Sequence, residues 1–333
     1  MGWLQNEFLI FWQNNPDLSQ KAAFEIFTRG EAPNIDASDD HDLTWNEIDA
    51  LTRGDTGEFN VACPYCGPDK PNSTRFKINR YSLSAARYYC FYCNRGGAVR
   101  CDGPVDPVKE AEARRRAAAR KADQQAERIA YALRLWDEAI SLTRSTLAQR
   151  YFAARAISEL PPNLDEVLRW HQSCPFGTYG NCPVMLALFR DGATNEPTGI
   201  HRTFIIGGAK AERMTLGRMV RAAIKLFPLD GDQLFVAEGI ENALSLSLGT
   251  FNGRPLRPVW AAGPAGNLAK LPLVPGVRRL VICADNGKAG EENAATCARR
   301  WRAAGREVEV IMPTQNGIDW NDLLKGNKND QRD

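Results

Sequence analysis

Two short apolar runs that each lead to an acidic residue constrain this sequence more than any other feature. Residues 234–237 (LFVA) run directly into Glu238, and residues 280–283 (LVIC) reach Asp285 after one further residue. A continuous apolar run is typical of a strand buried on both faces, and helix-like residues after each run indicate a parallel sheet. Functional groups of such sheets gather at the carboxyl ends of the strands. We therefore expect Glu238 and Asp285 at one edge of a parallel sheet.

Two carboxylates at one sheet edge suit a hard, oxygen-binding cation such as Mg²⁺. Each acid taken alone is equally explained as the N-cap or the first-turn charge of the helix that follows it. The pairing of Glu238 with Asp285, each close to a glycine, favours the metal site. The sequence therefore predicts a site for Mg²⁺ or Mn²⁺ held by these two acids.

The residues around the two acids resemble a known domain. Residues 236–245 (VAEGIENALS) and 284–290 (ADNGKAG) are similar to the Toprim domain of DnaG-type primases, topoisomerases and some nucleases, and phage and plasmid primases match best. Residues 317–324 (GIDWNDLL) resemble the closing motif of that domain, which implies Asp319 as a further acid. A helix N-cap is the alternative role for Asp319. The second motif of the family reads Asp-x-Asp, and this chain has Gly287 in place of its second acid.

Four cysteines in two CxxC pairs give the second strong signal. Cys63 and Cys66 are separated from Cys90 and Cys93 by 23 intervening residues. Four thiolates at such a spacing are typical of a closed, tetrahedral, structural Zn²⁺ site, whereas a redox dithiol requires only one CxxC pair. Cys101 has no CxxC partner, and we do not expect it to be a ligand.

The stretch between the cysteine pairs is expected to form a β-ribbon, with strands at residues 74–79 and 87–90 and a turn at residues 94–97. It interleaves cations with aromatic residues, which suits contacts with the backbone and bases of a single strand. About half of the aromatic side chains are expected to be structural, because so small a domain has little other core. The candidate nucleic-acid contacts are Arg75, Lys77 and Arg87. This stretch resembles the zinc-binding domain of DnaG-type and phage primases, which implies a role in template recognition.

A basic subdomain is expected before the Toprim domain. Its strands are predicted at residues 183–189 and 198–206, joined by a turn at residues 191–197. The segment resembles the subdomain that precedes Toprim in phage and plasmid primases, which implies basic residues that face the active site. The candidates are Arg202, Lys210, Arg218 and Lys225, together with His201. A lone histidine on a strand is, however, more often packed than catalytic.

The order of these segments defines the expected domains. The run from Val108 to about Ala154 contains no Pro or Gly and is rich in Ala, Arg and Glu, so a long helix is expected there. The acidic head before the ribbon is expected to be helical, and either docks on the next module or binds a partner. The predicted domains are an acidic helical head (1–60), a zinc ribbon (61–106), a helical linker (107–154), a basic α+β subdomain (155–231), a Toprim domain (232–325) and a tail (326–333).

Charge is unevenly distributed along the chain, although the net charge is only +2. Residues 1–60 carry 3 basic and 12 acidic side chains, residues 61–106 carry 7 and 3, and residues 107–231 carry 19 and 13. A basic middle segment suits a protein that meets a polyanion. No apolar stretch is long enough to cross a bilayer and no signal peptide is evident, so a cytoplasmic location is expected. The 9 cysteines then favour metal and thiol chemistry over disulfides.

These motifs together predict a multidomain α/β and α+β protein that acts as a DNA primase of a phage, plasmid or other mobile element. It would make short RNA primers on single-stranded DNA by metal-dependent nucleotidyl transfer. The expected partners are the template, NTPs and a separate replicative helicase, because the sequence has no P-loop motif. Two alternatives remain open: a non-enzymatic zinc and Toprim DNA-binding protein similar to recombination mediators, and a Toprim nuclease. The former have closely spaced cysteines, and a nuclease has no evident use for the ribbon.

Overall fold

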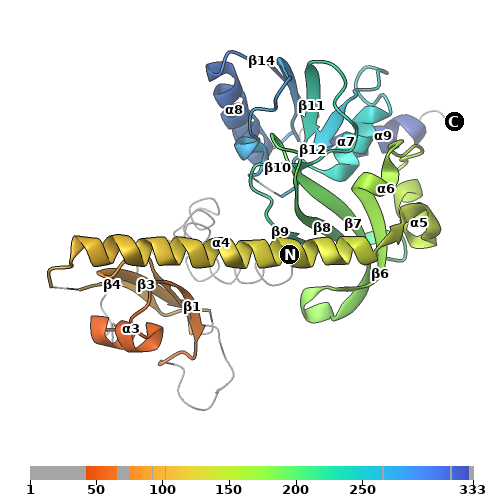
Figure 1. Cartoon of the computed structure of the whole chain (residues 1–333). Helices are drawn as coiled ribbons and strands as arrows, with labels where there is room; N and C mark the ends of the chain where they lie inside the picture. Colours follow the sequence, from red (N-terminus) through yellow and green to blue (C-terminus); the bar gives the residue numbers. More distant parts are fainter. Residues whose placement is uncertain are drawn as a thin grey trace. The chain divides into compact units, whose positions relative to one another are not determined.

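The computed structural model describes residues 43–65, 76–91, 93–101, 103–264, 266–315 and 317–329 (Figure 1). The chain divides into two compact units, Met1–Gln125 and Ala126–Asp333. Most of the predicted acidic head lies outside the described residues, as do Cys66, Arg75 and the last residues of the predicted tail.

The first unit contains a four-stranded antiparallel sheet in the order β1-β2-β3-β4. Its elements are α3 (Trp45–Thr52), β1 (Gly57–Val61), β2 (Phe76–Arg80), β3 (Ala85–Cys90) and β4 (Gly96–Arg100). Strands β2 and β3 include most of the two predicted ribbon strands, whereas β1 and β4 have no counterpart in the prediction. The sheet is therefore twice as wide as the sequence indicated.

The predicted turn at residues 94–97 is corrected, because Gly96 and Gly97 belong to strand β4. They lie directly opposite Tyr89 and Tyr88 of β3. A Cβ atom on Gly96 would stand 2.6 Å from the Tyr89 ring, and one on Gly97 would stand 2.7 Å from the Tyr88 hydroxyl. The two glycines thus make room for cross-strand aromatic rings. The turn itself precedes them, and Asn94 there has a left-handed φ of 57°.

The core of the first unit uses part of the aromatic set. Phe76 and Tyr88 are buried, whereas Tyr81 is 43% exposed. Arg80 is also buried; its guanidinium forms an ion pair with Asp49 at 2.7 Å and lies over the Trp45 ring. Because these contacts attach the sheet to helix α3, Arg80 has a structural role.

Helix α4 (Pro107–Glu138) is shorter than the predicted helix, which was expected to reach about Ala154. After residue 138 the chain forms β5 (Ile140–Ser141), the 3-10 helix η1 (Leu142–Arg144) and a new helix, α5 (Thr146–Ala154). Ile140 pairs with Trp170 of β6 (Leu168–Pro175), and the Ser145 hydroxyl caps α5 by accepting the Ala148 amide at 3.1 Å. β-branched and hydroxyl residues in this stretch favour a strand and a cap over a continuous helix. No helix among the described residues is long and apolar enough to cross a membrane.

The second unit is built on one ten-stranded sheet. Its main path runs β14-β13-β11-β12-β10-β7-β6-β5, and β8 and β9 continue from β7. The strands are β6 (Leu168–Pro175), β7 (Asn181–Asp191), β8 (Pro197–Ile206), β9 (Ala209–Gly217), β10 (Ala222–Ile224), β11 (Gln233–Ala237), β12 (Val259–Ala261), β13 (Arg279–Cys283) and β14 (Glu307–Ile311). The further helices are α6 (Leu164–Val167), η2 (Gly177–Tyr179), α7 (Ile240–Ser247), η3 (Leu268–Lys270), α8 (Lys288–Ala303) and α9 (Trp320–Asn329).

Strands β14, β13, β11 and β12 are mutually parallel, as the apolar runs predicted. In β11, Leu234 and Val236 pack on the side of helix α8, while Phe235 and Ala237 pack on the opposite side with α7 and α9. Both faces of the strand are therefore buried, which explains why the run contains no polar residue. The predicted α/β and α+β fold class is confirmed.

Strand β10 joins the two parts of the second unit that the sequence treated as separate domains. It pairs antiparallel with β12 through Ile224 and Ala261, and antiparallel with β7 through residues 222–224. The antiparallel strands β5–β10 and the parallel strands β11–β14 thus belong to one continuous sheet. A three-residue strand has too weak a periodic signal to be recognised from sequence.

Candidate active site and metal sites

Glu238 and Asp285 leave the parallel sheet at the same edge. Strand β11 ends at Ala237, and β13 ends at Cys283, its direct partner in the register. Because the two strands are parallel neighbours, the acids that follow them emerge side by side at the carboxyl edge of the sheet. The structure therefore brings together the two residues that the sequence singled out.

The two carboxyl groups lie in an unfavourable environment for negative charge. Burial, together with the charges of Glu238 and Asp319, raises the pKa of Asp285 to about 7 against an opposing hydrogen bond from Asn242. Burial also raises the pKa of Glu238, which Asn293 and Arg213 partly offset. The Oε1 atom of Glu238 is buried and has no hydrogen-bond partner in the described part of the chain. A buried carboxylate oxygen without a partner is costly, and a cation would remove that cost.

These acids fit a divalent cation that keeps several water ligands. Within the described ranges, only Cys63, Cys90 and Cys93 form a group of three ligand atoms all within 4.8 Å of one another. Glu238, Asp285 and Asp319 are therefore more widely spaced than a closed cage. Mg²⁺ is commonly bound by one or two carboxylates plus water and substrate phosphates, so two acids at an open edge suit it.

Asp319 caps helix α9. Its carboxylate accepts a hydrogen bond from the Asp322 amide at 2.8 Å, and the Asp319 amide donates to the Asp322 carboxylate at 3.5 Å. The sequence left open whether Asp319 is a cap or a further acid of the site, and the structure shows the cap. Its charge also acts on Asp285, so the cap lies close enough to contribute to the acidic edge.

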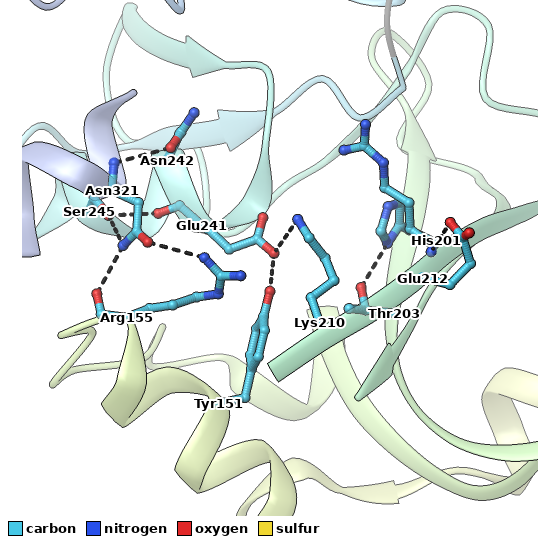
Figure 2. Close-up of polar contacts among 11 residues, drawn as sticks. Tyr151, Arg155, His201, Thr203, Lys210, Glu212, Glu241, Asn242, Ser245 and Asn321 are labelled. Carbon is cyan, nitrogen blue, oxygen red and sulfur yellow. Dashed lines mark hydrogen bonds and ion pairs between the residues drawn. The ribbon is translucent and has the colours of Figure 1, made fainter. Parts of the chain in front are cut away.

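Two asparagines hold Asp285 in place, and sequence reasoning missed both. Asn242 donates to the Oδ1 atom of Asp285 at 2.7 Å and accepts the Asn321 amide at 3.2 Å. The Asn321 side chain donates to Ser245 at 3.0 Å and to the Arg155 carbonyl at 2.9 Å (Figure 2). Asn242 lies in the same motif as Glu238, and Asn321 lies in the same motif as Asp319. Their positions in these two motifs were the sequence signal that could have identified them. Helices α7 and α9 are thereby linked behind the acidic edge.

Glu241 forms a second polar centre next to this one. Figure 2 shows its carboxylate between the Tyr151 hydroxyl, which donates to it, and the Lys210 ammonium, which lies 3.4 Å away. Lys210 and the Tyr151 hydroxyl are among the contacts that lower the pKa of Glu241 to about 2 against the effect of burial. Sequence reasoning singled out Lys210 but neither Glu241 nor Tyr151. Glu241 follows Glu238 by three residues, at the start of helix α7. This short spacing was the sequence signal that could have identified Glu241.

The predicted basic residues do not converge on one point. Lys210 joins Glu241, whereas the Arg218 guanidinium pairs with Asp191 at 3.1 Å. Arg202 is 8% exposed, donates to the carbonyls of Pro175 and Thr215, and lies over the Phe176 ring. These contacts correct the prediction that Arg202 faces phosphates, because both of its terminal guanidinium nitrogens donate to backbone oxygens in the interior.

Lys225 and His201 also differ in their surroundings. The Lys225 ammonium lies over the Trp260 ring, with 4.6 Å between the nitrogen and the ring centroid. His201 Nδ1 is 3.3 Å from the Thr203 hydroxyl, and burial lowers the pKa of His201 to about 4. His201 is therefore neutral at pH 7, in agreement with the packed role that a lone strand histidine favours.

A candidate metal site is built from Cys63, Cys90 and Cys93, whose sulfur atoms all lie within 4.8 Å of one another. The Sγ atoms of Cys63 and Cys93 are 3.8 Å apart, and the Cys90 Sγ accepts the Cys93 amide at 3.5 Å. Thiolates in a tetrahedron around Zn²⁺, each about 2.3 Å from the metal, are about 3.8 Å from one another. The three sulfurs therefore fit the predicted site, and the fourth predicted ligand, Cys66, is outside the described residues. Cys101 does not belong to the cluster.

One face of the first-unit sheet carries two of the predicted nucleic-acid contacts, Lys77 and Arg87. Lys77 lies opposite Tyr89, and Asn79 lies opposite Arg87, so these four side chains share a face by register. The Lys77 ammonium is 3.2 Å from Glu58 and its side chain is 43% exposed. The Arg87 guanidinium lies over the exposed Tyr81 ring at 5.8 Å. Cations and an exposed ring on one face fit the expected interaction with a single strand.

Comparison with known proteins identifies part of the chain. Residues 233–330 match the family model of the Toprim domain, so this part of the chain is a Toprim domain, as the motifs predicted. Residues 126–226 match a domain of unknown function, DUF7146. No curated protein matches the sequence.

Three of the solved structures found to be similar are described as primases or primase domains. One contains the zinc-binding and RNA polymerase domains of the Aquifex aeolicus primase, with 16% identity, 83% of this chain and 77% of that chain covered, and a TM-score of 0.39. Another is the RNA polymerase domain of Mycobacterium tuberculosis primase DnaG, with 16% identity, 63% and 82% covered, and a TM-score of 0.36. A third is a DNA primase domain from Pseudomonas aeruginosa, with 14% identity, 55% and 56% covered, and a TM-score of 0.32.

Proposed function

We propose that this chain is a DNA primase that synthesises short RNA primers on single-stranded DNA by metal-dependent nucleotidyl transfer. The observation that carries the proposal is the pair Glu238 and Asp285 at one edge of the Toprim sheet, with a buried carboxylate oxygen lacking a partner among the described residues. A site made for cation binding explains why two acids stay together where burial raises both pKa values and the charge of Glu238 also raises that of Asp285.

Each residue of the acidic edge has an assigned role in the proposal. Glu238 and Asp285, with Asp319 beside them, would hold Mg²⁺ or Mn²⁺. Such an ion lowers the pKa of an attacking hydroxyl and neutralises triphosphate charge. Asn242 fixes the orientation of Asp285 through its hydrogen bond. Lys210, which is 30% exposed beside Glu241, would contact the phosphates of the incoming nucleotide.

The first unit would bind the template. Zn²⁺ held by Cys63, Cys66, Cys90 and Cys93 would stabilise the sheet, and Lys77 and Arg87, with Arg75, would contact the DNA backbone. The proposed partners are single-stranded DNA, NTPs and a separate replicative helicase, in the replication of a phage, plasmid or other mobile element. Cations on the sheet face of an otherwise small domain support the first of these.

A product assay tests the proposal against its alternatives. The protein is incubated with random single-stranded DNA, labelled NTPs and Mg²⁺ or Mn²⁺, and the products are resolved by length. Short labelled RNA with intact template is the expected result. Shortened template without RNA would indicate a nuclease, and bound but unchanged DNA would indicate a binding protein. Asp230→Asn, which alters an exposed acid, is a control that keeps full activity.

A further inference from the structure

Three neighbouring strands of the second unit place two cations and an indole ring on one face of the sheet. Arg190 of β7 lies opposite Ala223 of β10, and Ile224 lies opposite Ala261 of β12. Side chains alternate along a strand, so Lys225 shares the face of Ala223 and stands beside Trp260. The contact of the Lys225 ammonium with the Trp260 ring agrees with this register.

These three side chains line a cavity of about 400 Å³. Other parts of its wall come from Phe227, Asn163 and Val274. The volume falls within the range of cavities that hold small ligands, about 300–1,000 Å³. The cavity is therefore large enough to admit a phosphate group with part of the molecule that carries it.

Neither cation of the cavity forms an ion pair with an acid of the part of the chain that the structure describes. In the described part of the chain, Lys225 forms no ion pair, and Arg190 donates only to the Asn195 carbonyl, at 3.2 Å. Asp191 forms its ion pair with Arg218 instead. Glu166 also lines the wall but pairs with neither cation. The pKa of Lys225 is lowered to about 8, mainly by burial; the nearby Asp191 carboxylate opposes this shift and the Arg190 charge adds to it.

This cavity is separate from the acidic edge. Strand β10 runs antiparallel to β12, so the chain after Ile224 proceeds toward the amino end of β12, and the Phe227 carbonyl accepts the Trp260 indole N–H at 2.9 Å. Glu238 and Asp285 stand at the opposite, carboxyl ends of the parallel strands. Lys225 was predicted to face the active-site phosphates, and its position indicates a different ligand site.

We propose that the cavity between Arg190, Lys225 and Trp260 binds a phosphate group, supplied either by a free nucleotide or by the backbone of a nucleic acid. Two cations that converge on one cavity, with an aromatic wall and without a paired acid, are complementary to a phosphate. This site goes beyond the proposed polymerase function, and it does not require the acidic edge to be catalytic.

The test measures binding without divalent metal, where the acidic edge repels phosphates. Pyrophosphate and a single-stranded oligonucleotide are titrated into the full chain by calorimetry in the presence of EDTA. Lys225→Met keeps the aliphatic contact with Trp260 but removes the charge, and Arg190→Met does the same on β7. Lys225→Arg restores the charge, and Lys270→Met is the control at an exposed lysine. Thermal melting of every variant verifies that it is folded.

The wild type is expected to bind, and each of the two Met variants is expected to weaken binding about tenfold or more, the effect of losing one charge-assisted hydrogen bond. Lys225→Arg and Lys270→Met should bind as the wild type does. A loss seen for pyrophosphate identifies a nucleotide phosphate, and a loss seen only for the oligonucleotide identifies the nucleic-acid backbone. Unchanged affinity of both Met variants, or a wild type that binds neither probe, would overturn the proposal.

Discussion

At the scale of single residues, Gly287 is the position where this chain departs from the Toprim motif. A Cβ atom built there meets nothing within 4 Å, and the φ of −175° is extended backbone that any residue adopts. Gly287→Asp should therefore fold normally and add a carboxylate beside Asp285. We expect a modest rise in primer synthesis and a lower Mg²⁺ requirement, because an additional oxygen ligand strengthens cation binding.

Titration of primer synthesis against Mg²⁺ measures the effect of Gly287→Asp. Gly290→Ala is the matched contrast, since its Cβ would stand 2.4 Å from the Asp285 carbonyl oxygen and must displace the backbone there. That variant should lose activity without any change in the ligand set. An Mg²⁺ requirement that stays the same in Gly287→Asp would argue against a cation at this edge.

The pKa of Asp285 leads to a prediction about stability without metal. It is raised from 3.8 to about 7 in the folded chain, so between about pH 4 and pH 7 the folded state holds a proton that the unfolded state releases. The free energy of unfolding should therefore fall as the pH rises through that window. Asp285→Asn cannot release this proton, and its stability should fall less over the same window.

Urea denaturation in EDTA between pH 4 and pH 8 measures this difference. Mg²⁺ should restore stability to the wild type above pH 7 by binding the ionised carboxylate, and should have little effect on Asp285→Asn. Parallel pH profiles for the two proteins would show that Asp285 titrates as an ordinary exposed acid.

At the scale of elements, the success of prediction follows the strength of each local signal. The strands β11 and β13 were predictable because burial on both faces leaves uninterrupted apolar runs. Strand β4 was not predictable, because its glycines are required by the rings of Tyr88 and Tyr89, which belong to another strand. The end of helix α4 was predicted too late, because the prediction relied on the helix-favouring composition of the segment and overlooked Ser145 as the N-cap of a new helix. Local patterns thus identified elements but not their long-range partners.

The same distinction applies to the candidate site. Glu238 and Asp285 were predictable because each closely follows a recognisable strand. Asn242 and Glu241 were not, because their roles depend on Asp285, Tyr151 and Lys210, which reach them through tertiary packing. Arg202 was misassigned because its position on a strand does not reveal that its guanidinium turns to interior carbonyls.

The proposed zinc site gives a prediction for the first sheet. Cys90 belongs to β3 and Cys63 follows β1, so loss of the metal should release both strands. Binding energy at a structural zinc site is folding energy, and Cys90→Ser should therefore lose zinc and unfold the first unit while the second unit stays folded. Metal analysis combined with limited proteolysis measures both effects. Full retention of zinc by Cys90→Ser would refute the assigned ligand set.

At the scale of the whole molecule, the charge distribution predicts salt-dependent binding to single-stranded DNA. Each phosphate contact releases counterions, so the slope of log affinity against log salt should fall by about 0.7 for each contact removed. The double variant Lys77→Ala/Arg87→Ala should reduce this slope measurably, since both residues share one sheet face. Fluorescence anisotropy over a salt series provides the measurement. An unchanged slope would place the DNA contacts elsewhere, in the basic segment 107–231.

The central claim is that Glu238 and Asp285 support nucleotidyl transfer on a single-stranded template. Primer synthesis and DNA binding are measured in parallel for the wild type and for Asp285→Asn, over a range of Mg²⁺ and Mn²⁺ concentrations. The wild type should make primers, and Asp285→Asn should lose activity about 100-fold or more, the effect of losing a few kcal/mol of metal-assisted stabilisation. DNA binding should be equal for both proteins. A wild type that binds DNA but makes no primers at any metal concentration would contradict the account.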